Sequence, residues 1–248
     1  MTVTDSPIDT IVVIVAMEKE AIPIVAKMRM DPANAESLGF NERLQLPVYY
    51  KEIGGRKVFL VTNGKDPIYG VDRVGTQPAV LTAYAVIEAL KPNVIINAGT
   101  AGGLKHAEIG EVYASKESFV FCDRIISLEK FREYGIGYFP CIPVAAIAQS
   151  VGLKLGIVAT GNSLDSSDRD IIELEKLDAD VVDMEAAAIA EVAQRLGVGM
   201  IALKAITNFL NKELHADFER NYTIAVTALA EKVSLVVPAI LGKNPSEL

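Results

Sequence analysis

Short apolar runs alternate along the chain with longer segments in which apolar residues recur at helical spacing. Residues 10–16 (TIVVIVA) form a continuous β-branched run, which is typical of a strand buried on both faces. Residues 17–28 have the spacing of a helix with one apolar face. Residues 48–53 and 57–62 read as two strands around a pair of glycines, which predicts a β-hairpin.

The same alternation continues to the end of the chain. It predicts helices over 71–90, 183–196 and 222–241, and strands over 93–97, 155–160, 179–182 and 199–206. Strands that alternate with helices predict a three-layer α/β/α sandwich around a mixed, largely parallel sheet. No fixed repeat or linker-like segment interrupts the pattern. We therefore expect one domain over residues 1–248, with loose ends at 1–9 and 242–248.

A glycine-rich segment follows the strand predicted over 93–97. In α/β sheets, ligands bind at the carboxyl ends of strands, so residues 98–103 (AGTAGG) are a candidate binding turn. Glycines allow close approach to a ligand, and free amides can hold an anion or a sugar. A tight turn without a ligand explains the segment equally well, because it matches neither common glycine-rich nucleotide motif.

Three further strand ends carry polar side chains. Glu20 enters the first predicted helix, either as a carboxylate favoured by the helix dipole or as a general base. Asp183 and Glu185 precede an alanine-rich helix, as exposed capping groups or as buried groups that need polar partners, and Met184 between them suits a core. Asn208 ends the last strand, as a turn residue or as an amide that reads a base edge.

Composition narrows the classes of protein and of site. With 24 basic and 32 acidic residues, the net charge of −8 argues against sequence-independent binding of nucleic acid. The only cysteines, Cys122 and Cys141, fit a reduced cytoplasmic protein, although one disulfide stays open. The sequence has no cluster of cysteines and histidines that would suggest a metal site. We expect no signal peptide and no membrane partner, because no uninterrupted apolar run reaches the ~18 residues of a membrane span.

Five separated segments carry a resemblance to a known family. They are residues 16–20 (AMEKE), 97–103 (NAGTAGG), 160–165 (TGNSLD), 183–188 (DMEAAA) and 204–208 (KAITN). In order and spacing they resemble the purine nucleoside phosphorylase/nucleosidase family over nearly the whole chain. Residues 64–66 (GKD) and 70–76 (GVDRVGT) look most similar to the plant-type 5′-methylthioadenosine nucleosidases. The resemblance implies a homodimer that cleaves the N-glycosidic bond of a purine nucleoside. Nothing in the sequence suggests a metal or organic cofactor.

The resemblance also implies roles for individual residues. Glu20 matches the carboxylate that deprotonates the attacking water, and Glu185 matches the one that binds the ribose hydroxyls, with Met184 under the sugar. Thr100 and the amides near Gly102 match positions that line the ribose and nucleophile side. Further substrate-binding positions are Met17, Ala101 and Asp183. Those that cover the purine are Leu164 and Asp165. Positions around the 5′ substituent, some donated by a partner subunit, are Phe131, Tyr134 and His215.

Asn208 departs from this pattern. Methylthioadenosine nucleosidases carry an aspartate there that protonates adenine N7, a step worth ~10²–10⁴-fold in general acid catalysis. Asparagine can donate a hydrogen bond but cannot supply a proton. Three explanations stay open: an engineered Asp→Asn exchange, a natural enzyme for 6-oxopurine nucleosides, and a non-catalytic nucleoside-binding homologue. Asn162 is a second candidate exchange, in a motif that commonly reads Gly-Asp.

The nucleophile decides between hydrolysis and phosphorolysis. A phosphorylase needs cationic or amide groups for phosphate, and Arg73 and Lys65 are candidates, although either residue is also typical of solvated surface charge. Glu20 beside the nucleophile would repel phosphate and suit water. We therefore expect hydrolysis of 5′-methylthioadenosine, with S-adenosylhomocysteine as a second candidate substrate, and place phosphorolysis of 6-oxopurine nucleosides behind it.

Overall fold

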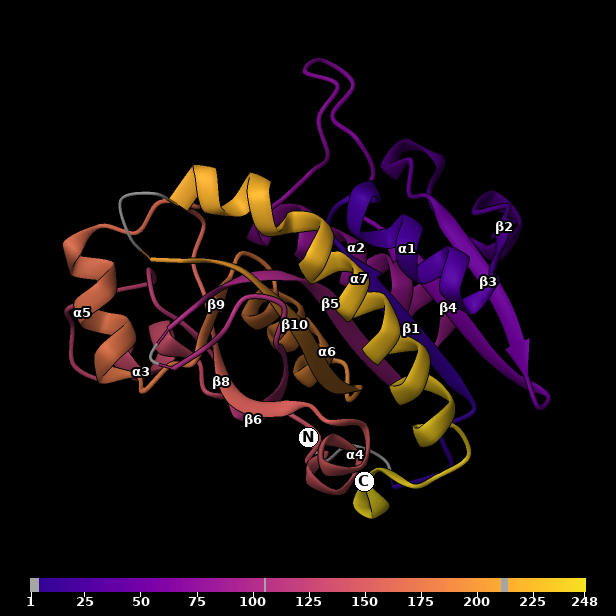
Figure 1. Ribbon diagram of the computed structural model, residues 1–248. Helices are drawn as coiled ribbons and strands as arrows, with labels where there is room; N and C mark the ends of the chain where they lie inside the picture. Colours follow the sequence, from indigo (N-terminus) through magenta and orange to yellow (C-terminus); the bar gives the residue numbers. More distant parts are fainter. Residues whose placement is uncertain (1–4, 105, 211–213) are drawn as a thin grey trace.

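A mixed sheet with helices on both faces makes up the protein (Figure 1). The computed structural model describes residues 5–104, 106–210 and 214–248, with backbone only at 214–218. Within these residues the strands are β1 (Thr10–Val15), β2 (Asp31–Ala33), β3 (Val48–Ile53), β4 (Arg56–Thr62), β5 (Val94–Gly103), β6 (Val112–Phe121), β7 (Phe139–Pro140), β8 (Lys154–Thr160), β9 (Val181–Asp183) and β10 (Gly199–Phe209). The helices are α1 (Glu18–Met28), α2 (Thr76–Leu90), α3 (Phe131–Ile136), α4 (Ala145–Val151), α5 (Asp168–Lys176), α6 (Ala186–Arg195) and α7 (Leu214–Ile240). The predicted mixed α/β fold is confirmed.

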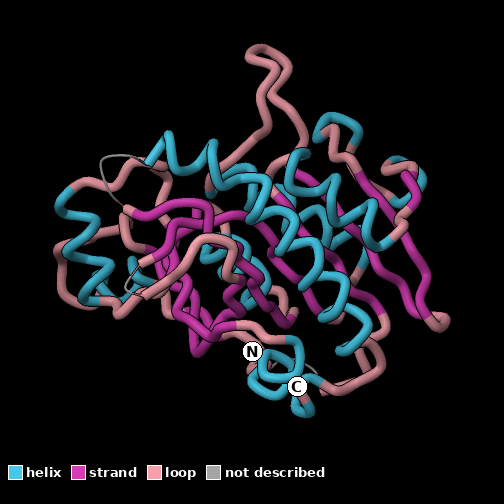
Figure 2. Tube along the Cα trace, in the orientation of Figure 1, coloured by secondary structure: helices cyan, strands magenta, loops and turns pink. Residues whose placement is uncertain are grey.

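The sheet consists of two parallel groups of strands. Strands β4, β1, β5 and β10 run parallel to one another, and β6, β8 and β9 form the second parallel group. Antiparallel pairings of β10 with β6 and of β5 with β9 join the groups, so that this end of the sheet closes on itself. Strands β3 and β2 extend the opposite edge as antiparallel strands (Figure 2).

Strand β1 shows why the sheet is covered on both faces. Ile11, Val13 and Val15 belong to a core shared with α1, α4 and α7, whereas Val12 and Ile14 belong to a core shared with α2 and α6. Successive strand residues point to opposite faces, so an uninterrupted β-branched run requires apolar packing on each side. This is the arrangement that the run predicts.

Strand β5 differs from the sequence prediction. It does not turn at the glycine-rich segment but continues as strand to Gly103, paired with β10 and then with β9. A Cβ on Gly103 would lie 2.8 Å from Cβ of Ala107 and 2.9 Å from Cγ2 of Ile206. The predicted turn is therefore wrong, and the small residues serve close packing between strands.

Three helices begin at residues other than those predicted. Helix α2 begins at Thr76 instead of residue 71, because Gly75 adopts a φ of 95° that few other residues tolerate. Helix α6 begins at Ala186 instead of residue 183, since Asp183 still belongs to β9. Helix α7 begins at Leu214, well before the predicted residue 222.

The two ends of the chain are not loose as predicted, over the part that the structure describes. The Ile8 amide donates to the Lys243 carbonyl at 3.0 Å, and the Gly242 amide donates to Ile8 at 2.9 Å. The Ser246 hydroxyl donates to Asp5, and Leu248 is buried in the core with α7. Mutual packing therefore orders both ends.

Helix α7 is the longest helix among the described residues and crosses the front of the sheet in Figure 1. Its segment Glu219–Ile240 is long and apolar enough to cross a membrane, with a mean hydropathy of 1.6. Core helices of soluble proteins pass the same test, and Leu229, Val233 and Val237 are fully buried against the sheet. The length and composition of α7 are therefore only weak indications of a membrane span.

Candidate active site

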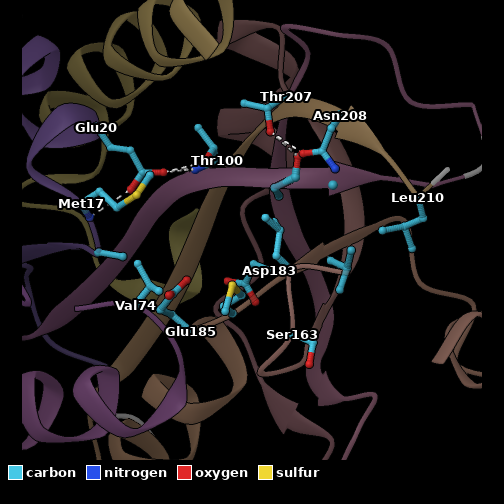
Figure 3. Close-up of a pocket in the computed structure, with 16 residues that line it drawn as sticks. Met17, Glu20, Val74, Thr100, Ser163, Asp183, Glu185, Thr207, Asn208 and Leu210 are labelled. Atoms are coloured by element: carbon cyan, nitrogen blue, oxygen red, sulfur yellow. Dashed lines mark hydrogen bonds between the residues drawn. The ribbon is translucent and has the colours of Figure 1, made fainter. Parts of the chain in front are cut away.

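A cavity of about 310 Å³ lies where β1, β8, β9 and β10 end, beside the second half of β5 (Figure 3). Predicted site residues that line it are Met17, Glu20, Thr100, Ala101, Gly102, Leu164, Asp183, Met184, Glu185 and Asn208. The sequence-based set lacked Ala16, Val74, Ser163, Val182, Thr207 and Leu210, which also line it. Segments far apart in the chain thus meet at one cavity.

Glu20 is a buried carboxylate at the start of α1. Its Oε1 accepts hydrogen bonds from the amide and the hydroxyl of Thr100, both at 2.7 Å, and its Oε2 accepts from the Met17 amide at 3.2 Å. Burial raises the pKa of Glu20, while the Thr100 hydrogen bonds and the charge of Lys204 act in the opposite direction. A carboxylate that is oriented and has a raised pKa suits a general base.

Glu185 is a second buried carboxylate, between β9 and α6. Its Oε1 accepts a 2.8 Å hydrogen bond from the amide of Gly75, the residue that precedes α2. Burial and then the charge of Asp183 raise the pKa of Glu185 to about 7, against the lowering effects of Lys204 and the Gly75 amide. An ionised carboxylate can accept further hydrogen bonds through both of its oxygens, so Glu185 suits the binding of hydroxyl groups.

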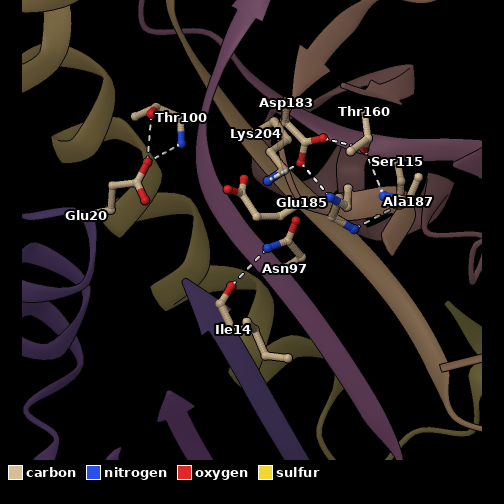
Figure 4. Close-up of polar contacts among 12 residues, drawn as sticks. Ile14, Glu20, Asn97, Thr100, Ser115, Thr160, Asp183, Glu185, Ala187 and Lys204 are labelled. Atoms are coloured by element: carbon tan, nitrogen blue, oxygen red, sulfur yellow. Dashed lines mark hydrogen bonds and ion pairs between the residues drawn. The ribbon is translucent and has the colours of Figure 1, made fainter. Parts of the chain in front are cut away.

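Asp183 is held from several sides (Figure 4). Its Oδ2 lies 2.7 Å from Nζ of Lys204 and accepts from the Ala186 amide, and its Oδ1 accepts from the Thr160 hydroxyl at 2.6 Å. Lys204 is 1% exposed, so this ion pair is buried. The contacts tie the end of β9 to β8, β10 and α6, and so fix the neighbouring Glu185.

Asn208 is oriented by its neighbour. The Thr207 hydroxyl donates to Oδ1 of Asn208 at 2.7 Å, and Nδ2 lies on the side of Gly102, 3.4 Å from the position of a Cβ there. Asn208 is 3% exposed and lines the cavity. The amide is thereby arranged as a hydrogen-bond donor toward this part of β5.

Strand β5 separates the two ends of the site. Thr100 contacts Glu20, whereas Gly102 faces Asn208. Two residues of strand span ~7 Å, and Figure 3 shows Glu20 and Asn208 on opposite sides of the cavity. The Glu20 carboxylate and the Asn208 amide therefore lie at separate ends of the cavity.

The charged side chains that line the cavity, among the described residues, are carboxylates. Its described lining contains Glu20, Asp183 and Glu185 but no lysine or arginine. The two cations considered for phosphate are engaged elsewhere. Arg73 donates to the Leu44 carbonyl at 2.8 Å, and Lys65 pairs with Glu18. Asp183 is paired with Lys204, which lies behind the lining, so the carboxylates that an oxyanion such as phosphate would meet are Glu20 and Glu185.

Three predicted positions, Asp165, Phe131 and Tyr134, are absent from the lining of the cavity. Asp165 is exposed next to the lining residue Leu164. Phe131 and Tyr134 are about half exposed on α3, with ring centroids 6.3 Å apart. His215 has a helical backbone, but its side chain lies outside the described residues.

Sequence reasoning missed the network that fixes the carboxylates. Lys204 interrupts the apolar strand of residues 199–206, and a lone cation in a buried strand requires a buried partner. That signal was present, but it could not identify Asp183. The contacts of Thr160 and Thr207 have no comparable signal, because threonine is ordinary in strands.

The described residues contain no cluster of three or more His, Cys, Asp or Glu side chains that could hold a metal ion. Both cysteines are free thiols, with Cys122 buried and Cys141 partly buried. The side-chain polar groups that line the cavity are carboxylates, hydroxyls and an amide.

Comparison with known proteins identifies the family. The sequence profile of the phosphorylase superfamily matches residues 10–238. The chain belongs to the phosphorylase superfamily. Within it, the chain is 37% identical to the 5′-methylthioadenosine nucleosidase of Arabidopsis thaliana over 246 residues, which are 98% of this chain and 91% of the relative.

A further relative and a solved structure agree with this position in the superfamily. The 5′-methylthioadenosine/S-adenosylhomocysteine nucleosidase of Arabidopsis thaliana is 37% identical over 247 residues, 98% of this chain and 96% of the relative. The apo structure of the Arabidopsis thaliana 5′-methylthioadenosine nucleosidase has a TM-score of 0.92 at 36% identity, and covers 98% of this chain and 100% of that chain. The predicted resemblance to plant-type nucleosidases is confirmed.

Proposed function

We propose that the protein hydrolyses the N-glycosidic bond of 5′-methylthioadenosine, and that S-adenosylhomocysteine is a second substrate. The nucleosidases to which it is similar are named for these two nucleosides. The cavity supplies what such a substrate needs: a basic carboxylate at Glu20, a hydroxyl-binding carboxylate at Glu185 and an amide for the purine at Asn208.

In the proposed reaction, Glu20 accepts a proton from water while the water oxygen attacks the anomeric carbon. Thr100 keeps the Glu20 carboxylate in place through two hydrogen bonds. Glu185 accepts hydrogen bonds from the ribose hydroxyls and stabilises the positive charge that develops on the sugar. The C–N bond electrons leave with adenine while Asn208 donates a hydrogen bond to N7 of the departing base. The base then takes a proton from solvent, and Glu20 returns the proton of the attacking water to solvent.

The absence of cations from the described lining of the cavity carries the choice of hydrolysis over phosphorolysis. Phosphate would have to enter beside Glu20 and Glu185 with no lysine or arginine in that lining to bind it. Water carries no charge and can be deprotonated by the same Glu20. Phosphorolysis of 6-oxopurine nucleosides is the second candidate, because the Asn208 amide can both donate and accept hydrogen bonds.

Asn208 limits the rate in this proposal. Without a protonated acid at N7, adenine is a poorer leaving group, so turnover is slow while binding is retained. A homologue that only binds nucleosides is the limiting case of the same site.

We further infer that the protein acts in the cytoplasm, in the recycling of methylthioadenosine to methionine, as a homodimer. Phe131 and Tyr134 expose about half of their surface on α3 outside the cavity of their own chain, which suits donation to a neighbouring subunit. Both cysteines are free thiols, as a reducing compartment requires.

A substrate panel tests the proposal. The protein is incubated with methylthioadenosine, S-adenosylhomocysteine, adenosine and inosine, with and without phosphate, and released base and bound nucleoside are quantified. Adenine released from methylthioadenosine without phosphate supports the proposal. Hypoxanthine released from inosine only with phosphate would establish the phosphorylase instead, and tight binding without any release would establish the binding protein.

A further inference from the structure

Asn162 lies at the junction of two segments that line different parts of the cavity. Its own segment continues into Ser163 and Leu164, which line the cavity after β8. Its side chain contacts Thr76, the first residue of α2, which is 86 positions away in the sequence. On the α2 side, Val74 lines the cavity and Gly75 contacts Glu185.

The contact between Asn162 and Thr76 caps a helix from outside it. Oδ1 of Asn162 accepts from the Thr76 amide at 3.0 Å and from the Thr76 hydroxyl at 2.8 Å. The first amides of a helix have no partner within the helix, and Gly75 supplies no side chain to bind them. The Asn162 backbone is held in turn, because its amide donates to Oδ2 of Asp123 at 2.7 Å.

The residue before Thr76, Gly75, contacts the carboxylate of Glu185. The amide of Gly75 donates to Oε1 of Glu185 at 2.8 Å, directly before the residue that Asn162 holds. Gly75 has a φ of 95°, a conformation that its surroundings must maintain, and a Cβ at this position would lie 3.2 Å from Oδ1 of Asn162. Rotation of the first turn of α2 would therefore redirect the Gly75 amide away from Glu185.

We propose that Asn162 is a positioning residue, which holds Thr76 and Gly75 so that the Gly75 amide fixes Glu185 for the ribose hydroxyls. The inference rests on the proposed function in one respect, the binding of ribose by Glu185. In this role Asn162 acts through Thr76 and Gly75 and does not have to contact the purine itself. It also links the segment that covers the base to the carboxylate that binds the sugar.

The test compares a nucleoside with its free base. Adenine lacks the ribose that Glu185 binds, whereas methylthioadenosine carries both parts. Asn162→Ala should weaken binding of methylthioadenosine about tenfold, as expected for the loss of about one net hydrogen bond in the chain of contacts, and leave adenine binding unchanged. Calorimetry on the full-length protein gives both dissociation constants.

Matched variants separate positioning from a folding defect. Asn162→Asp keeps an oxygen that accepts both Thr76 hydrogen bonds, and should retain nucleoside affinity. Thr76→Val removes only the hydroxyl bond and should show a smaller loss than Asn162→Ala, whereas Thr76→Ser keeps the hydroxyl and should bind like the unmodified protein. If Asn162→Ala does not fold, the Thr76 pair carries the same comparison.

Each result decides the matter. Equal weakening of adenine and methylthioadenosine would mean that Asn162 only supports the purine segment, and would overturn the inference. Unchanged affinity for both ligands would overturn it as well. If the unmodified protein binds adenine but not methylthioadenosine, the proposed function itself fails, and the role of Asn162 fails with it.

Discussion

At the scale of single residues, the site combines two buried carboxylates with an amide where an acid is expected. Glu20 and Glu185 both have pKa values raised by burial, yet their hydrogen-bond partners differ, which suits different roles. The Thr207 hydroxyl donates a hydrogen bond to Oδ1 of Asn208 and so orients its amide. The consequences of each of these groups can be measured separately.

Asn208→Asp should raise the rate of adenine release at least about tenfold. The Thr207 hydroxyl would bind one carboxylate oxygen as it now binds Oδ1, and the other oxygen would carry the proton for N7. Single-turnover kinetics with methylthioadenosine measure the effect, with Asn208→Ala as the control that removes both abilities. Equal rates for the unmodified protein and Asn208→Asp would show that position 208 is not the site of the acid.

Nucleoside binding should depend on pH through Glu185. Its pKa of about 7 means that the free protein loses the carboxylate form as the pH falls below about 7, whereas ribose hydroxyls require that form. The groups that face it are Asp183, Lys204 and Glu20. Affinity for methylthioadenosine should therefore fall by up to about tenfold per pH unit below that value and level off above it.

Titration calorimetry between about pH 5.5 and about pH 8.5 checks this dependence. Glu185→Gln should bind more weakly at high pH and show no such slope, because its amide does not titrate in this range. Adenine serves as the ligand control. A slope that persists in Glu185→Gln would assign the titration to another group.

At the scale of secondary structure, apolar patterning predicted the elements with strong signals. The β-branched run of β1 and the glycine pair between β3 and β4 specify their structures locally. The path of β5 through its glycines depends on contacts with β9 and β10, which local pattern does not contain. The same holds for the start of α2, where Gly75 takes its conformation beside Glu185 and Asn162.

The candidate site was predicted by a different route from the fold. Residue type and spacing left Glu20, Glu185 and Asn208 each with a structural and a functional explanation, and only the ordered set of motifs decided between them. The contacts that support these groups were not predictable from the sequence. A hydrogen bond such as that from Thr160 to Asp183 joins residues that only the fold brings together. Periodicity reports which face is buried, not which polar groups pair.

The buried pair of Lys204 and Asp183 should stabilise the junction of β9, β10 and α6. Lys204→Met would leave Asp183 as a buried carboxylate near Glu185 and Glu20, and should lower the free energy of unfolding by ~3–5 kcal/mol. The double variant with Asp183→Asn removes both charges and should recover most of that loss. Urea unfolding at one protein concentration measures both variants.

The opposite order would contradict this account of the pair. If the double variant is less stable than Lys204→Met alone, Asp183 matters mainly through its hydrogen bonds to Thr160 and Ala186 and not through its charge.

At the scale of the whole molecule, exposed apolar side chains suit an interface with a second copy. Helix α2 exposes Leu81 and Tyr84, which are 56% and 55% exposed at neighbouring positions of one helix face. The adjoining loop, which projects from the top of the molecule in Figure 1, exposes Ile68 and Tyr69 at 82% and 78%. Exposed apolar side chains that gather on one surface mark interaction sites.

We propose this surface as the interface of the homodimer, so Leu81→Glu should give a monomer, because a carboxylate would be buried there. The matched control is Ile22→Glu, which is similarly exposed at 54% but lies on α1, against the other face of the sheet. Light scattering at fixed concentration reports the mass. A dimer that survives Leu81→Glu but not Ile22→Glu would move the interface to the α1 face.

The most direct test of the whole account is the identity of the sugar formed from methylthioadenosine. The protein is incubated at stoichiometric concentration with this nucleoside in the presence of phosphate, and the products are separated by mass spectrometry. The acidic cavity predicts adenine together with free methylthioribose, released slowly because Asn208 supplies no proton. Methylthioribose 1-phosphate as the sugar product would contradict the account, since phosphate would then have entered beside Glu20 and Glu185 with no lysine or arginine in the described lining.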